Sequence, residues 1–194
     1  MRPEMGTTNG TKVTNGMMRG WDLRKVGGEG RCLGMSDLDV LIRVYEARDL
    51  EVLRDLTVAS FGSVAVDEML EERFEVWNGR DWKARKADHI DEDVAANAGG
   101  CFVAECEGRV VGYITTRLDR VNGIGRIPNL AVAESMRGRG LGRRLIEYAL
   151  GFFREAGMGL AKIETMASNP IGQKLYPACG FEEVGRQVHY AMRL

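Results

Sequence analysis

Apolar positions in the first half of the chain follow first a strand pattern and then a helical one. A mostly apolar run at residues 40–45 predicts a first strand. Residues 49–60 carry apolar side chains at helical spacing, which predicts a core-facing helix with Leu50, Leu53, Leu56 and Ala59 on one side. Leu70, Phe74 and Trp77 predict a second helix that starts near Asp67 and ends at Asn78-Gly79.

The apolar period then shortens to that of strands. Residues 101–106 and 109–118 predict two strands joined by a turn at Glu107-Gly108. Asn122-Gly123 is a strong hairpin signal and leads to a third strand at 127–133. We therefore expect three antiparallel strands in the middle of the chain.

The last third of the chain returns to helical spacing. One apolar face predicts a helix that Gly157 ends, with Leu141, Leu145, Tyr148, Ala149 and Phe152 on that face. A strand at 161–166, a short helix, and terminal strands around Val184 and at 188–192 are expected to follow. Together these elements predict a mixed α/β domain.

Length and composition limit the possible classes of protein. The chain has 194 residues, and we expect a flexible N-terminal extension over 1–36 and one domain over 37–194. The net charge of -1 argues against broad binding to nucleic acid or anionic lipid, and no apolar run approaches the roughly 20 residues of a membrane span. The four cysteines lack metal or redox spacing, so we expect reduced thiols, no metal and a cytoplasmic protein.

Residues 66–93 are acidic, with ten acids against five bases. A solvated helical face explains this composition best. The alternative is an entrance that attracts a cationic amine.

The most informative segment is a glycine-rich basic turn between a predicted strand and a helix. Gly138, Gly140 and Gly142 let the backbone approach a ligand closely, and free N–H groups at a helix start bind anions. Arginines at 137, 139, 143 and 144 would add charge-assisted hydrogen bonds. The dinucleotide fingerprint and the P-loop are both excluded, because neither spacing is present. We expect a phosphate group at this turn.

Two motifs carry a resemblance to a known family. Arg137-x-x-Gly140-x-Gly142 after Leu-Ala-Val resembles the acetyl-CoA motif of the GCN5-related N-acetyltransferase (GNAT) superfamily. The segment from Asn169 to Phe181, with its Leu-Tyr pair and Gly-Phe, resembles that family's second motif. The resemblance is sharp over residues 124–190 and diffuse back to about 37.

The resemblance implies a splayed, mostly antiparallel mixed sheet flanked by helices, the acyl-CoA N-acyltransferase type. It implies that the backbone of Leu130, Ala131 and Val132 pairs with the pantetheine arm and that Asn169 contacts the cosubstrate. It also places the diphosphate on Arg137, Gly138, Arg139, Gly140, Leu141, Gly142 and Arg143. Gly172 departs from the alanine common in the family, which weakens the short helix.

Acetyl transfer needs an unprotonated amine, a stabilised oxyanion and a proton for the departing thiolate. The resemblance places Tyr176 near the thioester sulfur, where its hydroxyl can give that proton. Glu164 is a candidate general base, by similarity to the ribosomal-protein N-terminal-alanine acetyltransferases, and an ordered water chain is an equal alternative. His89 and His189 show no spacing of a ligand or a triad.

The resemblance predicts an acyltransferase (EC 2.3.1 type) that moves an acetyl group from acetyl-CoA to a primary amine in a ternary complex. Alternatives are a non-catalytic acyl-CoA sensor and, among enzymes, a small-molecule (aminoglycoside or polyamine) rather than a protein acetyltransferase. The acceptor could be a small molecule, a protein N-terminus or a lysine. Neither nucleic acid nor membrane is an expected partner, and a homodimer is left open.

Overall fold

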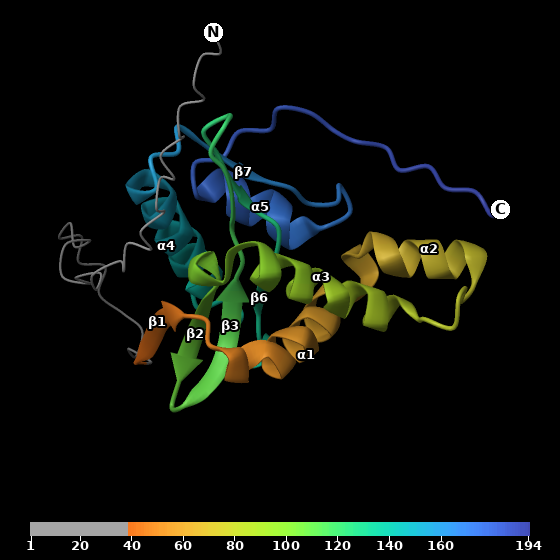
Figure 1. Cartoon of the computed structure of the whole chain (residues 1–194), viewed down its shortest axis with the longest axis horizontal. Helices are drawn as coiled ribbons and strands as arrows, with labels where there is room; N and C mark the ends of the chain where they lie inside the picture. Colours follow the sequence, from red (N-terminus) through yellow and green to blue (C-terminus); the bar gives the residue numbers. More distant parts are fainter. Residues whose placement is uncertain (1–38) are drawn as a thin grey trace, which may run out of the picture. The chain divides into compact units, whose positions relative to one another are not determined.

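The computed structural model describes residues 39–194, so the expected extension at 1–36 lies outside the described residues. One sheet has the order β1-β2-β3-β6, with every neighbouring pair antiparallel (Figure 1). Its strands are β1 (Val40–Val44), β2 (Phe102–Cys106), β3 (Arg109–Ile114) and β6 (Leu130–Val132). The expected mixed α/β fold is therefore present.

A second sheet has the order β4-β5-β7, in which β5 is antiparallel to β4 and parallel to β7. Its strands are β4 (Arg117–Asp119), β5 (Ile124–Ile127) and β7 (Leu160–Ile163). The predicted continuous strands at 109–118 and 127–133 were wrong, because each is broken into two that belong to different sheets. Pro128 has no N–H to donate to a ladder, which suits a break between β5 and β6.

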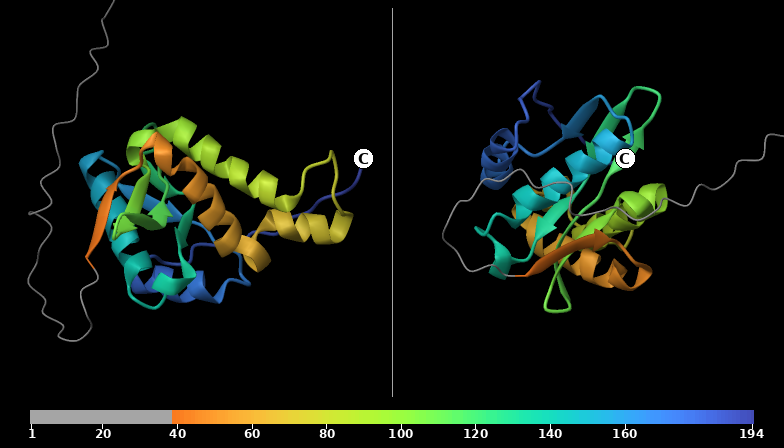
Figure 2. Two further views of the ribbon diagram at one scale, coloured as in Figure 1. Left: turned by 90° about the horizontal axis from the view of Figure 1, so that it is seen from below. Right: turned by 90° about the vertical axis from the view of Figure 1, so that its left-hand side faces the viewer.

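Helices cover both faces of the first sheet. Contacts link α1 (Leu50–Phe61) with β3 and β6, whereas α4 (Leu141–Glu155) contacts β2, β3 and β6. Figure 2 shows the strands between α4 and the pair formed by α1 and α3 (Trp82–Asn97). The remaining helices are α2 (Val66–Phe74) and α5 (Pro170–Ala178), and short 3-10 turns occur at Ala47–Asp49, Gly62–Val64, Ala98–Gly100 and Glu134–Met136. None of the helices within 39–194 is both long and apolar enough to cross a bilayer.

The core lies between α1, α3 and the first sheet. Leu53, Ile90, Val103 and Tyr113 are fully buried and form one cluster. The hydroxyl of Tyr113 is 2.6 Å from the Thr57 hydroxyl, so this buried polar group has a partner. On the other face of the sheet, α4 buries four of the five side chains that its spacing predicts, Leu141, Leu145, Ala149 and Phe152, while Tyr148 is half-buried. The helix also buries Ile146 and Phe153, which the predicted stripe did not include.

Helix α3 was missed as a separate element. Its start carries a recognisable signal, because the Asp81 carboxylate accepts a hydrogen bond from the Ala84 N–H at 2.8 Å. Its sixteen residues position the buried Asp93 and Lys86 that are described below.

The predicted terminal strands were also wrong, since residues 181–194 have no strand. Their apolar side chains at even positions are typical of a half-buried strand, yet Val184 and Tyr190 are 94% and 93% exposed. Such a pattern forms a strand only beside a partner, and within 39–194 no strand lies along this segment.

Candidate acetyl-CoA site

The glycine-rich turn leads directly into α4. Gly138 and Gly140 have φ values of +73° and +75°, a left-handed conformation that favours glycine. Gly140 is the N-cap of α4, and no side chain caps the helix. The first N–H groups of α4, including those of Leu141 and Gly142, are thus available to an anion. A Cβ added at Gly138 or Gly140 would meet nothing within 4 Å, so no other part of the described chain crowds these two positions.

The four arginines of this turn differ in their hydrogen-bond partners. Arg144 donates to the Val40 carbonyl of β1 at 2.9 Å, so the expectation that it faces the anion was wrong. Arg143 donates to the Ala178 carbonyl at the end of α5, and Arg137 donates to the Val132 carbonyl at 3.4 Å. Arg139 is exposed and has no hydrogen bond or ion pair within residues 39–194. Arg139 and Arg137 therefore remain the best placed to meet phosphate groups.

Strand β6 has one free edge. Asn129 and Ala133 form backbone hydrogen bonds with β3, both at 2.9 Å. Because strand residues alternate in direction, Leu130 and Val132 turn their N–H and C=O groups to the opposite edge. Strand β6 is last in its sheet, so within the described residues that edge faces no strand. An extended pantetheine arm could pair there, beside the uncapped start of α4.

Helix α5 packs against the start of α4. A Cβ at Gly142 would lie 3.2 Å from the Leu175 side chain. The Asn169 carbonyl oxygen caps α5 by accepting from Ile171 and Gly172, and its amide donates to the Thr165 hydroxyl at 2.9 Å. Both the oxygen and the nitrogen of the Asn169 side-chain amide therefore have hydrogen-bond partners within the chain.

The structure explains why residue 172 is glycine, which the sequence did not. It is buried, and a Cβ there would meet the Thr165 hydroxyl at 2.8 Å and the Asn169 amide nitrogen at 3.1 Å. The close contact of the 165–169 loop with α5 therefore requires glycine at this position.

Tyr176 lies on α5 and is half-buried. Burial raises the pKa of its hydroxyl to about 12, against an opposing hydrogen bond with Thr165. Its ring stacks edge-on with Phe181 at a centroid distance of 6.3 Å. The raised pKa keeps the hydroxyl protonated at neutral pH, which is the form a general acid needs.

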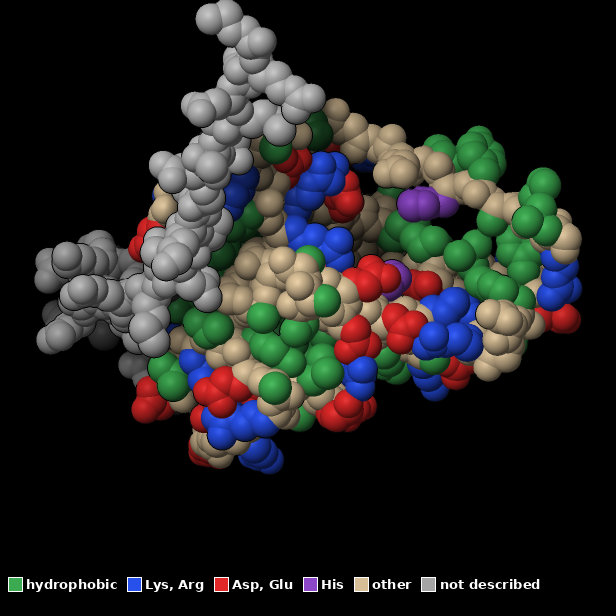
Figure 3. Space-filling view, viewed as in Figure 1, with side chains coloured by type: hydrophobic (Ala, Val, Ile, Leu, Met, Phe, Trp, Pro, Cys, Tyr) green, Lys and Arg blue, Asp and Glu red, His purple; other side chains and the backbone are tan. Residues whose placement is uncertain are grey.

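Glu164 is the first residue after β7, which ends three residues earlier than the strand predicted at 161–166. Its side chain is 69% exposed, and one carboxylate oxygen is 2.5 Å from the Lys162 ammonium. Glu164 also lines a pocket of about 190 Å³ between the ends of β5 and β7, together with Arg117, Arg126, Ile127, Pro128, Lys162 and Ile163. On the face drawn in Figure 3, basic and acidic side chains meet in a hollow near the middle.

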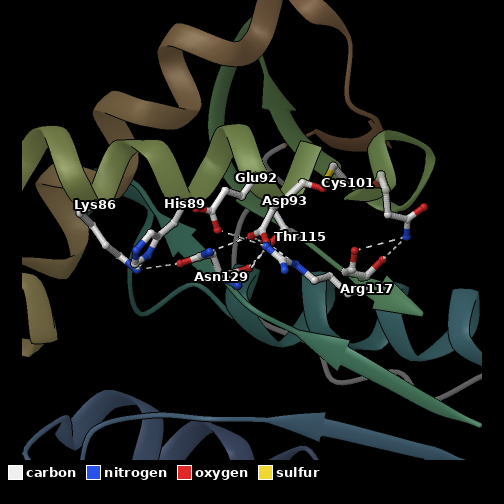
Figure 4. Close-up of polar contacts among 10 residues, drawn as sticks. Lys86, His89, Glu92, Asp93, Cys101, Thr115, Arg117 and Asn129 are labelled. Atoms are coloured by element: carbon white, nitrogen blue, oxygen red, sulfur yellow. Dashed lines mark hydrogen bonds and ion pairs between the residues drawn. The ribbon is translucent and has the colours of Figure 1, made fainter. Parts of the chain in front are cut away.

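Sequence reasoning missed a buried polar network behind this pocket (Figure 4). Asp93 of α3 is 1% exposed and accepts hydrogen bonds from the Thr115 hydroxyl at 2.6 Å and the Asn129 amide at 2.7 Å. Arg117 donates its Nε to the same carboxylate at 2.8 Å. The network connects α3 to the two places where the chain passes from one sheet to the other, between β3 and β4 and between β5 and β6. No local motif could reveal it, because its members come from three distant segments.

Lys86 extends the network along α3. Its ammonium donates to the Asn129 oxygen at 2.9 Å and lies 4.3 Å from the centre of the Phe61 ring. Burial lowers the pKa of Lys86, with the charges of Asp67 and Asp93 opposing this shift. His89 lies 3.4 Å from the Lys86 ammonium and 3.9 Å from Asp67, whereas His189 is exposed.

The acidic segment 66–93 forms many of its own ion pairs. Arg80 pairs with Asp88 at 2.7 Å, and Arg85 pairs with Glu71 at 3.2 Å. A shallow hollow of about 250 Å³ nonetheless lies between α2 and the start of α3, lined by Glu68, Glu71, Glu72 and Trp82. In Figures 1 and 2 these elements extend away from β5 and β7, so the hollow is separate from the pocket at Glu164.

Known proteins share this architecture. The Acetyltransferase (GNAT) family model matches residues 50–181. Aminoglycoside N(6')-acetyltransferase type 1 of Salmonella typhimurium is 30% identical over 128 residues, which cover 62% of this chain and 88% of that protein. Mycothiol acetyltransferase of Rhodococcus jostii is 29% identical over 165 residues, which cover 79% of this chain and 49% of that protein.

Solved structures of acetyltransferases have a fold similar to that of this chain. The CoA complex of aminoglycoside N-acetyltransferase AAC(6')-Iy is 26% identical, with a TM-score of 0.55, and the match covers 84% of this chain and 100% of that one. The family model covers most of the domain, and the mixed α/β fold agrees with that of the solved acetyltransferase. The chain therefore belongs to the GNAT family and is an acetyltransferase.

Proposed function

We propose that this enzyme binds acetyl-CoA along β6 and transfers its acetyl group directly to a primary amine of a small molecule. The observation that carries the proposal is the free edge of β6 next to the uncapped start of α4. The start of α4 binds the diphosphate, and the free edge of β6 binds the extended pantetheine arm. This arrangement brings the thioester to the point where the two sheets part. The names of the relatives, which include aminoglycoside and mycothiol acetyltransferases, favour a small-molecule acceptor over a protein.

The chemistry can be assigned to residues at that point. The amine lone pair attacks the thioester carbonyl, and the C–S bond breaks as the tetrahedral oxyanion collapses. Backbone N–H groups on the free edge of β6 would stabilise the oxyanion. The Tyr176 hydroxyl would protonate the departing thiolate, while Glu164 or a water chain beside it would remove the proton from the amine. No step needs a metal, and the cytoplasm remains the predicted location.

Substitution of Tyr176 tests the proposal. Tyr176→Phe should lower kcat by about 10²- to 10⁴-fold with little change in acetyl-CoA affinity, because it removes one proton donor. Tyr190→Phe is the matched control, since Tyr190 is 93% exposed and is not part of the pocket lining. Free-thiol release measures turnover, and calorimetry measures acetyl-CoA binding. Unchanged turnover in Tyr176→Phe would remove it from the mechanism, and binding without turnover by the wild type would indicate a sensor.

Glu164→Gln separates the two candidate bases. A drop in kcat near neutral pH that shrinks in acid, where the wild-type carboxylate is itself protonated, identifies the carboxylate, whereas an unchanged kcat and pH profile assign proton removal to water. Glu182→Gln provides the same chemical change at an exposed site outside the pocket.

A further inference from the structure

Three cations stand in a row across the second sheet. Arg117 of β4 is the register partner of Arg126 on β5, and Arg126 is the register partner of Lys162 on β7. Register partners point to the same face of a sheet with Cβ atoms about 5 Å apart. All three side chains accordingly line the pocket of about 190 Å³ that also contains Glu164. Like charges directly opposite each other destabilise a sheet, so each cation of the row needs a compensating negative group from the chain or from a ligand.

The outer two cations have partners within the chain. Arg117 donates to the buried Asp93 at 2.8 Å, and the Lys162 ammonium is 2.5 Å from Glu164. Arg126, in the middle, is exposed and forms no hydrogen bond or ion pair within residues 39–194. Asp93 and Glu164 thus neutralise the two outer cations, and Arg126 is the one cation of the pocket lining that has no ion pair within the described residues.

The position of the row fits an acceptor site. Pro128 and Glu164, which flank the point where β6 and β7 part, line the same pocket. An amine near Glu164 would therefore have the cationic row beside it. A polycation such as an aminoglycoside would be repelled there, and the acidic hollow that could attract one lies on α2 and the start of α3.

We propose that the acceptor is a small amine that also carries an anionic group, either a carboxylate or a phosphate. Arg126 binds this group, with help from the remaining donors of Arg117 and Lys162. A guanidinium presents a planar fork of N–H donors that matches either anion. This inference rests on the proposed acetyl transfer and names the acceptor class for the same site.

Matched acceptors test the charge requirement. Free-thiol release should be measured with amino acids, with their carboxamides, with phosphoethanolamine and ethanolamine, and with kanamycin and spermidine. We expect kcat/KM to be about tenfold to a hundredfold higher for the anionic member of a pair, the range for one hydrogen bond to a charged group. The carboxylate and phosphate pairs distinguish the two anions.

Variants link any preference to the row. Arg126→Gln should raise KM for the anionic acceptor by about tenfold or more and leave kcat nearly unchanged, whereas Arg126→Lys should restore part of the preference. Arg120→Gln is the control, because Arg120 is exposed on the same hairpin but outside the pocket. The melting temperature of Arg126→Gln should be unchanged or higher, because the substitution relieves repulsion within the sheet.

Binding separates failure of this inference from failure of catalysis. Calorimetry with CoA-saturated protein should detect N-acetylglycine more strongly than N-acetylglycinamide, and Arg126→Gln should abolish the difference. If no amine is acetylated but this difference is found, the anion site stands and amine transfer fails. Equal binding of the two compounds, or a preference for kanamycin or spermidine that Arg126→Gln leaves unchanged, would overturn the anionic acceptor.

Discussion

Replacement of Asp93 by alanine should be the most damaging single change in the polar network. The carboxylate is 1% exposed and accepts hydrogen bonds from Thr115, Asn129 and Arg117 at 2.6–2.8 Å. Its removal leaves three donors, from two distant segments, without their partner. Asn129 immediately precedes β6, so the loss should also disturb the edge on which acetyl-CoA is proposed to bind.

The burial of Asp93 determines how much stability the Asp93→Ala variant should lose. Loss of one partner from a buried ion pair costs about 3–5 kcal/mol, because the other charge stays buried and unpaired. Arg117 is 42% exposed and can partly rehydrate, which favours the lower end of that range. For a domain of this size we expect a fall in melting temperature of about 6–12 °C.

Asp91→Ala is the matched control on the same helix. Asp91 pairs with Arg54 at 2.7 Å, but the two side chains are 37% and 32% exposed, so we expect a cost of no more than about 1 kcal/mol. Urea denaturation of both variants gives the free energies of unfolding, and calorimetry gives their acetyl-CoA affinities. If Asp93→Ala costs no more than Asp91→Ala, the network does not hold the sheet break in place.

Three further predictions concern other parts of the domain. Gly172→Ala should destabilise the protein by about 1–3 kcal/mol in urea denaturation, because its Cβ meets the Thr165 hydroxyl at 2.8 Å; a gain in stability would mean that helix propensity dominates. The hydrogen bonds from Arg43 hold the pKa of Asp49 below its ordinary value, so its contribution to stability is present above about pH 4 and lost as the pH falls through the lower folded pKa. Asp49→Asn should therefore be less stable than the wild type at pH 7 and approach it in acid, and a constant difference would contradict the linkage. Val188→Ser should change the free energy of unfolding by less than about 0.5 kcal/mol, since Val188 is 69% exposed, and a larger loss would show that this segment packs against something.

Local patterns predicted the elements whose partners are close or whose signal is strong. The apolar stripe of α4 and the glycine turn before it were both evident from spacing, and the family motifs supplied the splayed sheet. The sequence could not show that residues 109–118 and 127–133 each split between two sheets. At both breaks the chain is hydrogen-bonded to Asp93, which reaches Thr115 and Asn129 from a helix distant in the sequence.

The candidate site also combines features that local motifs predict with features that depend on distant contacts. The motifs located the turn at Gly140 and the Leu130–Val132 strand, but the binding roles of these residues stay predictions, as do the roles of Tyr176 and Glu164. Arg144 could not be separated from its neighbours, because its contact with Val40 joins residues 104 positions apart. The cationic row was hidden as well, since it exists only once the register of β4, β5 and β7 is known.

Hydrogen exchange with and without coenzyme A tests the central claim most directly. The account predicts that saturating coenzyme A slows amide exchange in two places, at 138–143 on the turn and start of α4 and at Leu130 and Val132 on the free edge of β6. Exchange in the acidic hollow at residues 68–72 should not change. If coenzyme A at millimolar concentration leaves both segments unprotected, the proposed binding mode is wrong.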